Sequence, residues 1–373
     1  MSNIVAFRAD ASLQIGTGHV MRCLTLADNL KARGVETHFI CREHAGHLID
    51  LIRDRGHLVH SLPTSSAARD IHEFSAIAHS DWLGTSQEKD AELCSQIVRL
   101  LHPDWLIVDH YALDECWEKL LRPFCKMLMV IDDLADRKHI CDLLLDQNFG
   151  SGTDDYLSLT PSDSHLLCGS QYALLRPEFS ALRAHSLLRR SSAMVINILI
   201  SMGGVDVDNA TQSVLSALQS CPLPSDAQIT VVMGKTAPWL HEVNEMAKKM
   251  PWPTQVKVNV SNMAELMSDA DISIGGAGST SWERCCLGLP SILIVLAANQ
   301  KDSCNRLELA GACKMIESID NISVELRALF TQILCGKDSL LAMQRCASEI
   351  TDGRGTQLIS NLISSRIFGV NNA

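Results

Sequence analysis

The chain has 373 residues, of which 46% are hydrophobic and 20% are charged, and its formal net charge is −11 at pH 7. This length and composition are typical of a globular protein with two ordinary domains and exclude a disordered or fibrous chain. An acidic balance without a Lys/Arg cluster argues against a general nucleic-acid binder, so a phosphorylated ligand would have to be held by backbone amides and a few placed side chains.

The fourteen cysteines are spread singly through apolar runs, with no C-x-x-C pair. This distribution is typical of reduced thiols that serve as small core residues in cytosolic enzymes. The first residues enter a predicted strand without the basic and apolar regions of a signal peptide. The two most apolar runs, 195–202 and 291–298, are shorter than the ~20 residues that cross a bilayer. We therefore expect a cytoplasmic protein with neither a membrane nor a nucleic-acid partner.

Short apolar runs alternate with amphipathic stretches in the first half of the chain, a pattern that predicts parallel strands covered by helices. Strands are predicted at residues 4–9, 35–41, 106–108 and 127–131, and helices at 19–33 and 47–55. The stretch 63–90 has mixed polarity and no clear period. We expect irregular structure there.

A second unit of the same style begins near residue 194, after the polar and basic stretch 183–192. Strands are predicted at 196–201, 229–233, 272–274 and 292–295, and helices from about 208, around 240–249, after 278 and through the tail 322–367. The sequence therefore predicts an α/β protein with two Rossmann-like domains that face a cleft, as in a GT-B-like fold. The expected boundaries are 1–186 for the first domain, 193–350 for the second, and 351–373 for a C-terminal helix that packs back on the first.

The first glycine-bearing loop, Gln14 to Arg22, joins the first predicted strand to its helix. Gly16 and Gly18 allow a close approach of the backbone to a ligand, and the free amides of a helix N-terminus attract an anion. His19 falls at the first positions of that helix, where the positive helix end disfavours an imidazolium. We therefore expect a neutral imidazole that can accept a proton. A surface cap residue is the alternative interpretation.

Two further features lie at the ends of predicted strands. Asp10 ends the first strand, where it could orient His19 or bind substrate, and a solvated strand-end carboxylate is the alternative. Gly203 and Gly204 follow the predicted strand 196–201. They could form a second backbone cradle for a pyrophosphate or a sugar, and a turn-forming glycine pair is the alternative.

In the third loop, Gly275 to Glu283, glycines and residues with hydroxyl groups precede a predicted helix. Its amides and the hydroxyls of Ser279 and Thr280 could together grip phosphate oxygens. Glu283 lies one turn inside the helix, on a side that could reach a ribose diol. A capping box between Thr280 and Glu283 fits the same residues, and both interpretations can hold together. All three loops follow predicted strands, and open α/β sheets bind ligands beyond the carboxyl ends of their strands, so the sequence predicts a ligand site there.

Six segments, in their order and spacing, resemble the PseG family: R-A-D-x-x-x-x-I-G-T-G-H-V-M-R near the start, then V-D-H-Y, L-L-R-P-E-F, S-M-G-G, G-G-A-G-S-T-S-W-E and A-N-Q. Members of this family are UDP-2,4-diacetamido-2,4,6-trideoxy-β-L-altropyranose hydrolases of pseudaminic acid biosynthesis, which resemble MurG-type glycosyltransferases in their GT-B fold. The resemblance spans roughly residues 4–310, and neither 63–90 nor the tail after about 316 carries a matching motif.

The resemblance implies roles for individual residues. His19 matches the histidine taken as the base that activates water, Asn299 matches an asparagine near the reacting sugar, and Tyr111 matches a tyrosine near the sugar end. The third loop matches the part of the family that grips uridine diphosphate. His19 and Asn299 are thus the candidate catalytic residues. The candidate substrate-binding residues are Asp10, Gly16, Gly18, Arg22, Tyr111, Gly203, Gly204, Ser279, Thr280, Glu283 and Gln300.

The resemblance implies hydrolysis of this UDP-activated amino sugar to free sugar and UDP, with inversion at the anomeric carbon and without a cofactor. One alternative is a MurG-like glycosyltransferase, although a lipid acceptor would call for a basic and apolar docking surface, for which the sequence offers no candidate. Another is a non-catalytic sensor of sugar nucleotides. A metal-dependent hydrolase would have to use the pairs His44 and His47 or His57 and His60, which lack carboxylate and cysteine partners in a zinc pattern. We expect no metal, and we expect a monomer because the sequence has no heptads.

Overall fold

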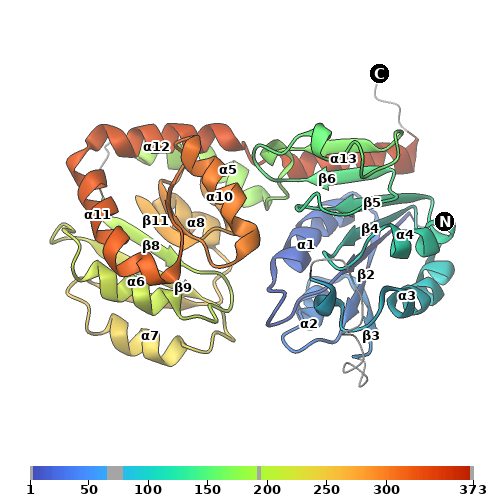
Figure 1. Cartoon of the computed structure of the whole chain (residues 1–373), viewed down its shortest axis with the longest axis horizontal. Coiled ribbons are helices and arrows are strands. Elements are labelled where there is room, and N and C mark those ends of the chain that lie inside the picture. The colour runs from blue at the N-terminus through green and yellow to red at the C-terminus, as the bar shows by residue number, and fades with distance from the viewer. Residues whose placement is uncertain (1–2, 65–78, 191–194, 370–373) are drawn as a thin grey trace. The chain divides into compact units, whose positions relative to one another are not determined.

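The computed structural model describes residues 3–64, 79–190 and 195–369 (Figure 1). The chain divides into two compact units, Met1–Leu174 with Gly355–Ala373 (unit 1) and Leu175–Arg354 (unit 2). Each unit contains one parallel sheet with helices packed against it, so the prediction of two Rossmann-like α/β domains is confirmed.

The sheet of unit 1 has seven strands in the order β3-β2-β1-β4-β5-β6-β7, all parallel. The strands are β1 Ile4–Ala9, β2 Glu36–Arg42, β3 Leu58–Leu62, β4 Trp105–Asp109, β5 Met127–Ile131, β6 Leu143–Asp146 and β7 His165–Cys168. The helices are α1 Gly18–Lys31, α2 Ile49–Asp54, α3 Gln87–Leu101, α4 Glu115–Leu121 and α13 Gly355–Phe368. The strand order reverses between β1 and β4, and such a reversal is where open α/β sheets bind ligands.

The sheet of unit 2 has six parallel strands in the order β10-β9-β8-β11-β12-β13, and its order reverses between β8 and β11. The strands are β8 Asn197–Ser201, β9 Gln228–Met233, β10 Thr254–Val258, β11 Ile272–Gly276, β12 Ser291–Ile294 and β13 Lys314–Ile316. The helices are α5 Pro177–Arg189, α6 Ala210–Leu218, α7 Leu240–Ala247, α8 Met263–Asp269, α9 Thr280–Cys286, α10 Lys301–Leu309, α11 Ile322–Cys335 and α12 Lys337–Ile350.

The central strands of unit 1 are buried on both faces, which is why they read as continuous apolar runs. Along β1, Val5 and Phe7 face a core that includes Ile359 of α13. Ala6, between them, faces a second core with Trp117 of α4. Because successive side chains of a strand point to opposite faces, one short segment anchors helices on both sides of the sheet.

Helix α5 belongs to unit 2, although the sequence analysis put a boundary at residue 186, inside this helix. The Nη1 atom of Arg183 donates to the carbonyl of Cys286 at 2.5 Å, and the Nε atom of Arg190 donates to the carbonyl of Ala270 at 2.6 Å. The basic stretch that precedes the second predicted unit therefore contains arginines that donate to backbone carbonyls at the ends of α8 and α9.

The stretch 63–90 is only partly irregular. Residues 65–78 lie outside the described part of the chain. Ser80–Leu83 forms a single-turn helix, η1, and α3 begins at Gln87, where the hydroxyl of Ser86 accepts a hydrogen bond from the amide of Lys89 at 3.3 Å. The expectation of irregular structure is therefore wrong from Gln87 onward, where a cap and a helical turn are present.

Every cysteine in the described residues is free of a disulfide bond, and the adjacent pair Cys285 and Cys286 is buried within α9. Within the described ranges, no helix is both long enough and apolar enough to cross a membrane.

Candidate functional site

His19 lies at the start of α1, next to the carboxyl end of β4. Thr17 is the N-cap and Gly18 the first helical residue, so His19 is the second residue of the helix, as the sequence predicts. The loop before it folds back on itself, with the amide of Gly16 donating to the carbonyl of Ser12 at 2.9 Å. Gly16 has a φ of 79°, a left-handed conformation that favours glycine.

The imidazole of His19 is held by a buried carboxylate. Its Nδ1 lies 2.6 Å from Oδ1 of Asp109, the last residue of β4. Burial alone would raise the pKa of Asp109, but the charges of Arg22 and His19 and their hydrogen bonds hold that pKa well below its usual value. An ionised carboxylate can only accept, so Nδ1 must carry a hydrogen. In the neutral ring, Nε2 is then the nitrogen with the lone pair.

Arg22 fixes the same carboxylate from its other side. Its Nε and Nη2 atoms lie 2.6 and 2.7 Å from the two oxygens of Asp109, a bidentate pair. Its Nη1 atom lies 2.5 Å from Oδ2 of Asp133, which also accepts a hydrogen bond from the hydroxyl of Tyr111 at 2.8 Å. Arg22 therefore joins His19 and Tyr111 through two carboxylates, and the structure brings these three predicted site residues together.

Aromatic rings stand beside His19. The ring of Tyr111 meets the imidazole edge-on, with centroids 4.5 Å apart, and Trp82 stacks on Tyr111 with centroids 5.7 Å apart. His79 lies 4.2 Å from Trp82. The described part of the stretch 63–90 thus supplies two rings to this group, which offers flat apolar faces next to the imidazole.

Asp10 is at the rim where the sequence predicts it, but its side chain is fully buried. Its Oδ1 accepts a hydrogen bond from the amide of Arg42 at 2.7 Å, and its Oδ2 lies 3.4 Å from Nε2 of His110. The expectation that Asp10 orients His19 is wrong, because the carboxylate bonded to His19 is Asp109. Asp10 instead ties together the ends of β1, β2 and β4.

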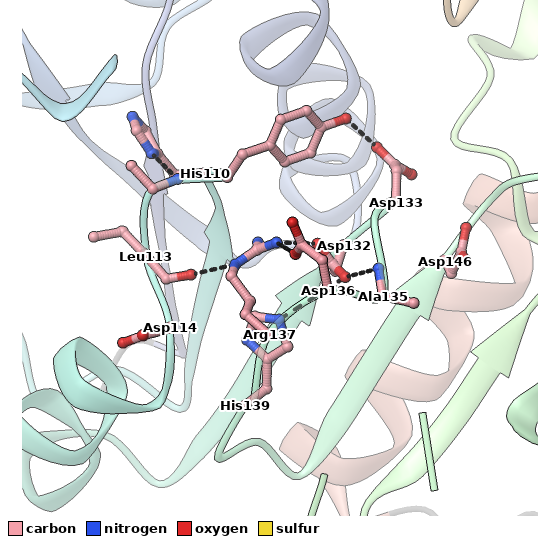
Figure 2. A network of polar contacts seen from close by, with 12 residues as sticks. His110, Leu113, Asp114, Asp132, Asp133, Ala135, Asp136, Arg137, His139 and Asp146 are labelled. Carbon is pink, nitrogen blue, oxygen red and sulfur yellow. Dashed lines mark hydrogen bonds and ion pairs between the residues drawn. The ribbon is translucent and has the colours of Figure 1, made fainter. Parts of the chain in front are cut away.

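Further carboxylates cluster at the ends of β5 and β6 (Figure 2). Asp132 forms an ion pair with Arg137 at 2.8 Å. The hydroxyl of Tyr156 lies 3.1 Å from an oxygen of Asp132 and 3.1 Å from an oxygen of Asp146. A hydroxyl has one hydrogen to donate, so the second contact is stabilising when Asp146 is protonated. Burial, helped by the charge of Asp133, raises the pKa of Asp146 to about 7.

In unit 2, glycines lie at the ends of three neighbouring strands. Gly203 and Gly204 are exposed and follow β8. A Cβ atom on Gly234, just after β9, would lie 1.9 Å from the carbonyl oxygen of Gly204, and one on Gly276 of β11 would lie 3.6 Å from that of Met202. These glycines therefore let the strand ends approach one another closely.

The loop after β11 leads into α9, which begins at Thr280 with Ser279 as its N-cap. Because the N-cap is Ser279 and Thr280 is already the first helical residue, the alternative of a capping box that starts at Thr280 is wrong. Glu283 faces Arg176, with Oε1 3.6 Å from Nη2. Burial raises the pKa of Glu283, and the charge of Arg176 opposes the rise. Ser279 itself is exposed.

Asn299 and Gln300 lie in the single-turn helix η6 Ala298–Gln300, which follows β12. Asn299 is exposed. The Oε1 atom of Gln300 accepts a hydrogen bond from the amide of Leu296 at 3.1 Å, and its Nε2 atom lies 3.7 Å from the Cβ position of Gly278. Gln300 is therefore next to the predicted third loop, within the same unit.

Across the described residues, no group of three or more His, Cys, Asp or Glu side chains could hold a metal ion. Both ring nitrogens of His57 are already engaged, Nδ1 with the hydroxyl of Thr37 at 2.6 Å and Nε2 with Asp28 at 2.9 Å. His60 lies 3.0 Å from His38, ring nitrogen to ring nitrogen.

Several residues that contact the candidates or lie beside them were absent from the sequence-based candidates: Asp109, Asp133 and Trp82 in unit 1, and Arg176 in unit 2. Asp109 and Asp133 carried a signal, because each is a charged residue at or just after the end of a continuous apolar run, where strand ends meet. Trp82 carried none, since its stretch has no period.

Comparison with known proteins agrees with this architecture. Residues 197–357 match the glycosyltransferase family 28 C-terminal domain, and nearly all of this segment lies in unit 2. The chain is 28% identical over 294 residues to the uncharacterized protein MJ1062 of Methanocaldococcus jannaschii, a match that covers 78% of this chain and 55% of that protein. It is 26% identical over 307 residues to the UDP-2,4-diacetamido-2,4,6-trideoxy-β-L-altropyranose hydrolase of Campylobacter jejuni, which covers 82% of this chain and 97% of the hydrolase.

Among solved structures, the chain is similar to MurG of Acinetobacter baumannii, with a TM-score of 0.66 and 17% identity over 98% of this chain and 100% of that one. The protein therefore has a MurG-like GT-B fold, as the sequence predicts.

Proposed function

We propose that this protein is a hydrolase that cleaves a UDP-activated amino sugar into free sugar and UDP, with inversion at the anomeric carbon. The observation that carries the proposal is the imidazole of His19, which the buried carboxylate of Asp109 contacts at 2.6 Å. The domain match to glycosyltransferase family 28 and the identity to the Campylobacter jejuni hydrolase support a UDP-sugar as the ligand.

Unit 1 supplies the base. Nε2 of His19 would take a proton from water, the water oxygen would form a bond to the anomeric carbon, and the bond from that carbon to the UDP oxygen would break with its electron pair leaving on UDP. The carboxylate of Asp109 would stabilise the imidazolium that forms. A positioned general base contributes ~100- to 10,000-fold to the rate.

Unit 2 supplies the grip on the nucleotide. The exposed backbone of Gly203 and Gly204 and the hydroxyls of Ser279 and Thr280 would hold the diphosphate and offset the negative charge that grows on it. Glu283 would accept hydrogen bonds from the ribose hydroxyls. A few placed donors suit a chain whose net charge is −11.

The sugar we propose is 2,4-diacetamido-2,4,6-trideoxy-β-L-altropyranose, the one that the Campylobacter jejuni relative acts on. Its acetamido methyl groups and its deoxygenated C6 are apolar, and the rings of Tyr111 and Trp82 beside His19 present apolar faces that suit them. Asn299 would contact the reacting sugar.

A glycosyltransferase is the second candidate, because the fold is also that of MurG and a histidine base can deprotonate an alcohol as well as water. The two activities differ in one respect that can be measured. A hydrolase releases UDP without an acceptor, whereas a transferase needs one.

The test is NMR of the purified protein with UDP-2,4-diacetamido-2,4,6-trideoxy-β-L-altropyranose and no acceptor. The hydrolase should release UDP and a free sugar of inverted anomeric configuration, and His19→Asn should lose turnover while still binding UDP. His165→Asn is the matched control, since His165 is exposed at the amino end of β7, the opposite edge of the sheet. Binding without cleavage would favour the transferase or a sensor, and full turnover by His19→Asn would exclude His19 as the base.

A further inference from the structure

Arg284 of α9 is a buried guanidinium whose hydrogen bonds all go to neutral groups. It is 1% exposed. Its Nε donates to the hydroxyl of Ser273 at 3.1 Å, Nη1 to the carbonyl of Gly276 at 3.0 Å, and Nη2 to the carbonyl of Ser201 at 3.3 Å. No carboxylate among the described residues comes within 4.0 Å of its nitrogens.

Four other buried arginines among the described residues contact a carboxylate. Arg8 and Arg42 share the carboxylate of Asp90, each at 2.7 Å. Arg190, which has no carboxylate in contact, donates to several carbonyls that include those of Ser268 and Ala270 at the end of α8. Burying a charge without a counter-charge is costly. Arg284 contacts no carboxylate among the described residues either, although the charge of Glu283, the preceding residue, favours its charged form, so its buried position calls for an explanation.

The surrounding backbone is built to admit this side chain. A Cβ atom on Gly275 would lie 2.0 Å from Nη2 of Arg284 and 2.5 Å from the carbonyl oxygen of Ser201. Only glycine at this position leaves room for the guanidinium between the ends of β8 and β11. Burial lowers the pKa of Arg284 to about 10, with the charge of Glu283 opposing the shift, so the side chain is still charged at neutral pH.

The two carbonyls that Arg284 binds end the strands from which the glycine loops of unit 2 start. Ser201 is the last residue of β8, two residues before Gly203, and Gly276 is the last residue of β11, two residues before Gly278. The guanidinium thus contacts the strand ends that lead into the loops proposed to bind the diphosphate. A charge in a buried, low-dielectric position acts over several ångströms and is only weakly screened by salt.

We infer that Arg284 is a positioning residue for the diphosphate of the bound nucleotide, whose negative charge the guanidinium attracts through the two strand ends that it holds. The inference rests on the proposed function, since it needs a nucleoside diphosphate on these loops. Arg284 acts on the ligand through the loop backbone and does not touch it. Its charge makes the electrostatic potential at the loops positive, and its hydrogen bonds fix and polarise the carbonyls at the two strand ends.

The test compares the binding of UDP with that of uridine by calorimetry. Arg284→Met removes the charge and fills the space, and Arg284→Gln removes the charge and keeps a donor. Both should lower the affinity for UDP on the order of 10-fold, while uridine, which carries no phosphate, stays within about twofold of the wild type. Lys249→Gln, which removes an exposed charge of the same unit, should change neither affinity.

A purely structural role would weaken UDP and uridine alike, and an unchanged ratio of the two affinities would overturn the inference. Replacing a buried charge by an apolar side chain often leaves stability equal or higher, so Arg284→Met should unfold at the wild-type temperature or above. Failure of both variants to fold would also overturn it. Wild-type protein that binds no UDP would instead refute the proposed function, on which the inference depends.

Discussion

Replacing Asp109 by asparagine keeps the shape of a buried side chain and removes its charge. Three donor nitrogens now converge on this carboxylate: Nδ1 of His19 at 2.6 Å, Nε of Arg22 at 2.6 Å and Nη2 of Arg22 at 2.7 Å. An asparagine has one acceptor oxygen and one NH₂ group. At least one donor would therefore face another donor, and the imidazole could turn or change its tautomer.

The expected loss can be worked out from these contacts. The variant loses the group that keeps the hydrogen on Nδ1 and that stabilises the imidazolium. A comparable substitution in the Ser-His-Asp triad costs ~10⁴-fold, and a general base is worth ~100- to 10,000-fold, so we expect kcat to fall by about 1,000-fold. Because Asp109 is fully buried, its side chain is out of reach of a ligand, and KM should stay within about threefold. Leaving Arg22 without this partner should also destabilise the fold by about 3 kcal/mol.

The assay is the initial rate of UDP release, measured well below the unfolding temperature of the variant, with folding checked by circular dichroism. Asp163→Asn is the control, because Asp163 is exposed. A folded Asp109→Asn protein that keeps more than about a tenth of the wild-type kcat would refute the reasoning that this carboxylate holds the base.

Three further substitutions test other parts of the account. Asp146→Asn should stabilise the protein at pH 8 and not at pH 4. The pKa of Asp146 in the folded protein is raised to about 7. The wild type therefore loses stability as the pH rises from about 4 to about 7, by up to ~4 kcal/mol. Urea unfolding at both pH values measures this, and an equal effect at both would contradict it. Trp82→Ala should raise KM about 5- to 10-fold with kcat nearly unchanged, because the ring packs near His19 and moves no proton; a large fall in kcat alone would argue otherwise. Gly275→Ala should cost ~1–3 kcal/mol in chemical denaturation, because the new methyl group meets the guanidinium of Arg284, and wild-type stability would contradict the packing described for that side chain.

Most central strands could be predicted from the sequence, with the exception of β6, and the edge strands could not. The predicted runs 4–9 and 127–131 coincide with β1 and β5, which lie between two neighbours and are apolar apart from Arg8. β10, Thr254–Val258, is an edge strand whose residues are all exposed or only partly buried. Its polar sequence therefore has no continuous apolar run to predict it.

In the candidate site, too, features set by neighbouring residues could be predicted, and contacts between residues far apart in the sequence could not. The position of His19 at a helix start follows from the glycines beside it. Its partner Asp109 is 90 residues away in sequence, and the two meet because β1 pairs with β4, with Ala9 opposite Asp109. Asp10 lies at the same rim, but the direction of its side chain depends on Arg42 and other buried groups that the sequence does not identify.

The central claim is that water attacks the anomeric carbon of a UDP-sugar. Its most direct test is to run the reaction with UDP-2,4-diacetamido-2,4,6-trideoxy-β-L-altropyranose in ¹⁸O-water, without an acceptor, and to examine the released UDP by phosphorus NMR. Cleavage of the bond between carbon and oxygen predicts that UDP carries no ¹⁸O on its β-phosphate. Label on that phosphate would mean attack at phosphorus, and no release of UDP would mean that water is not the acceptor; either result would contradict the claim.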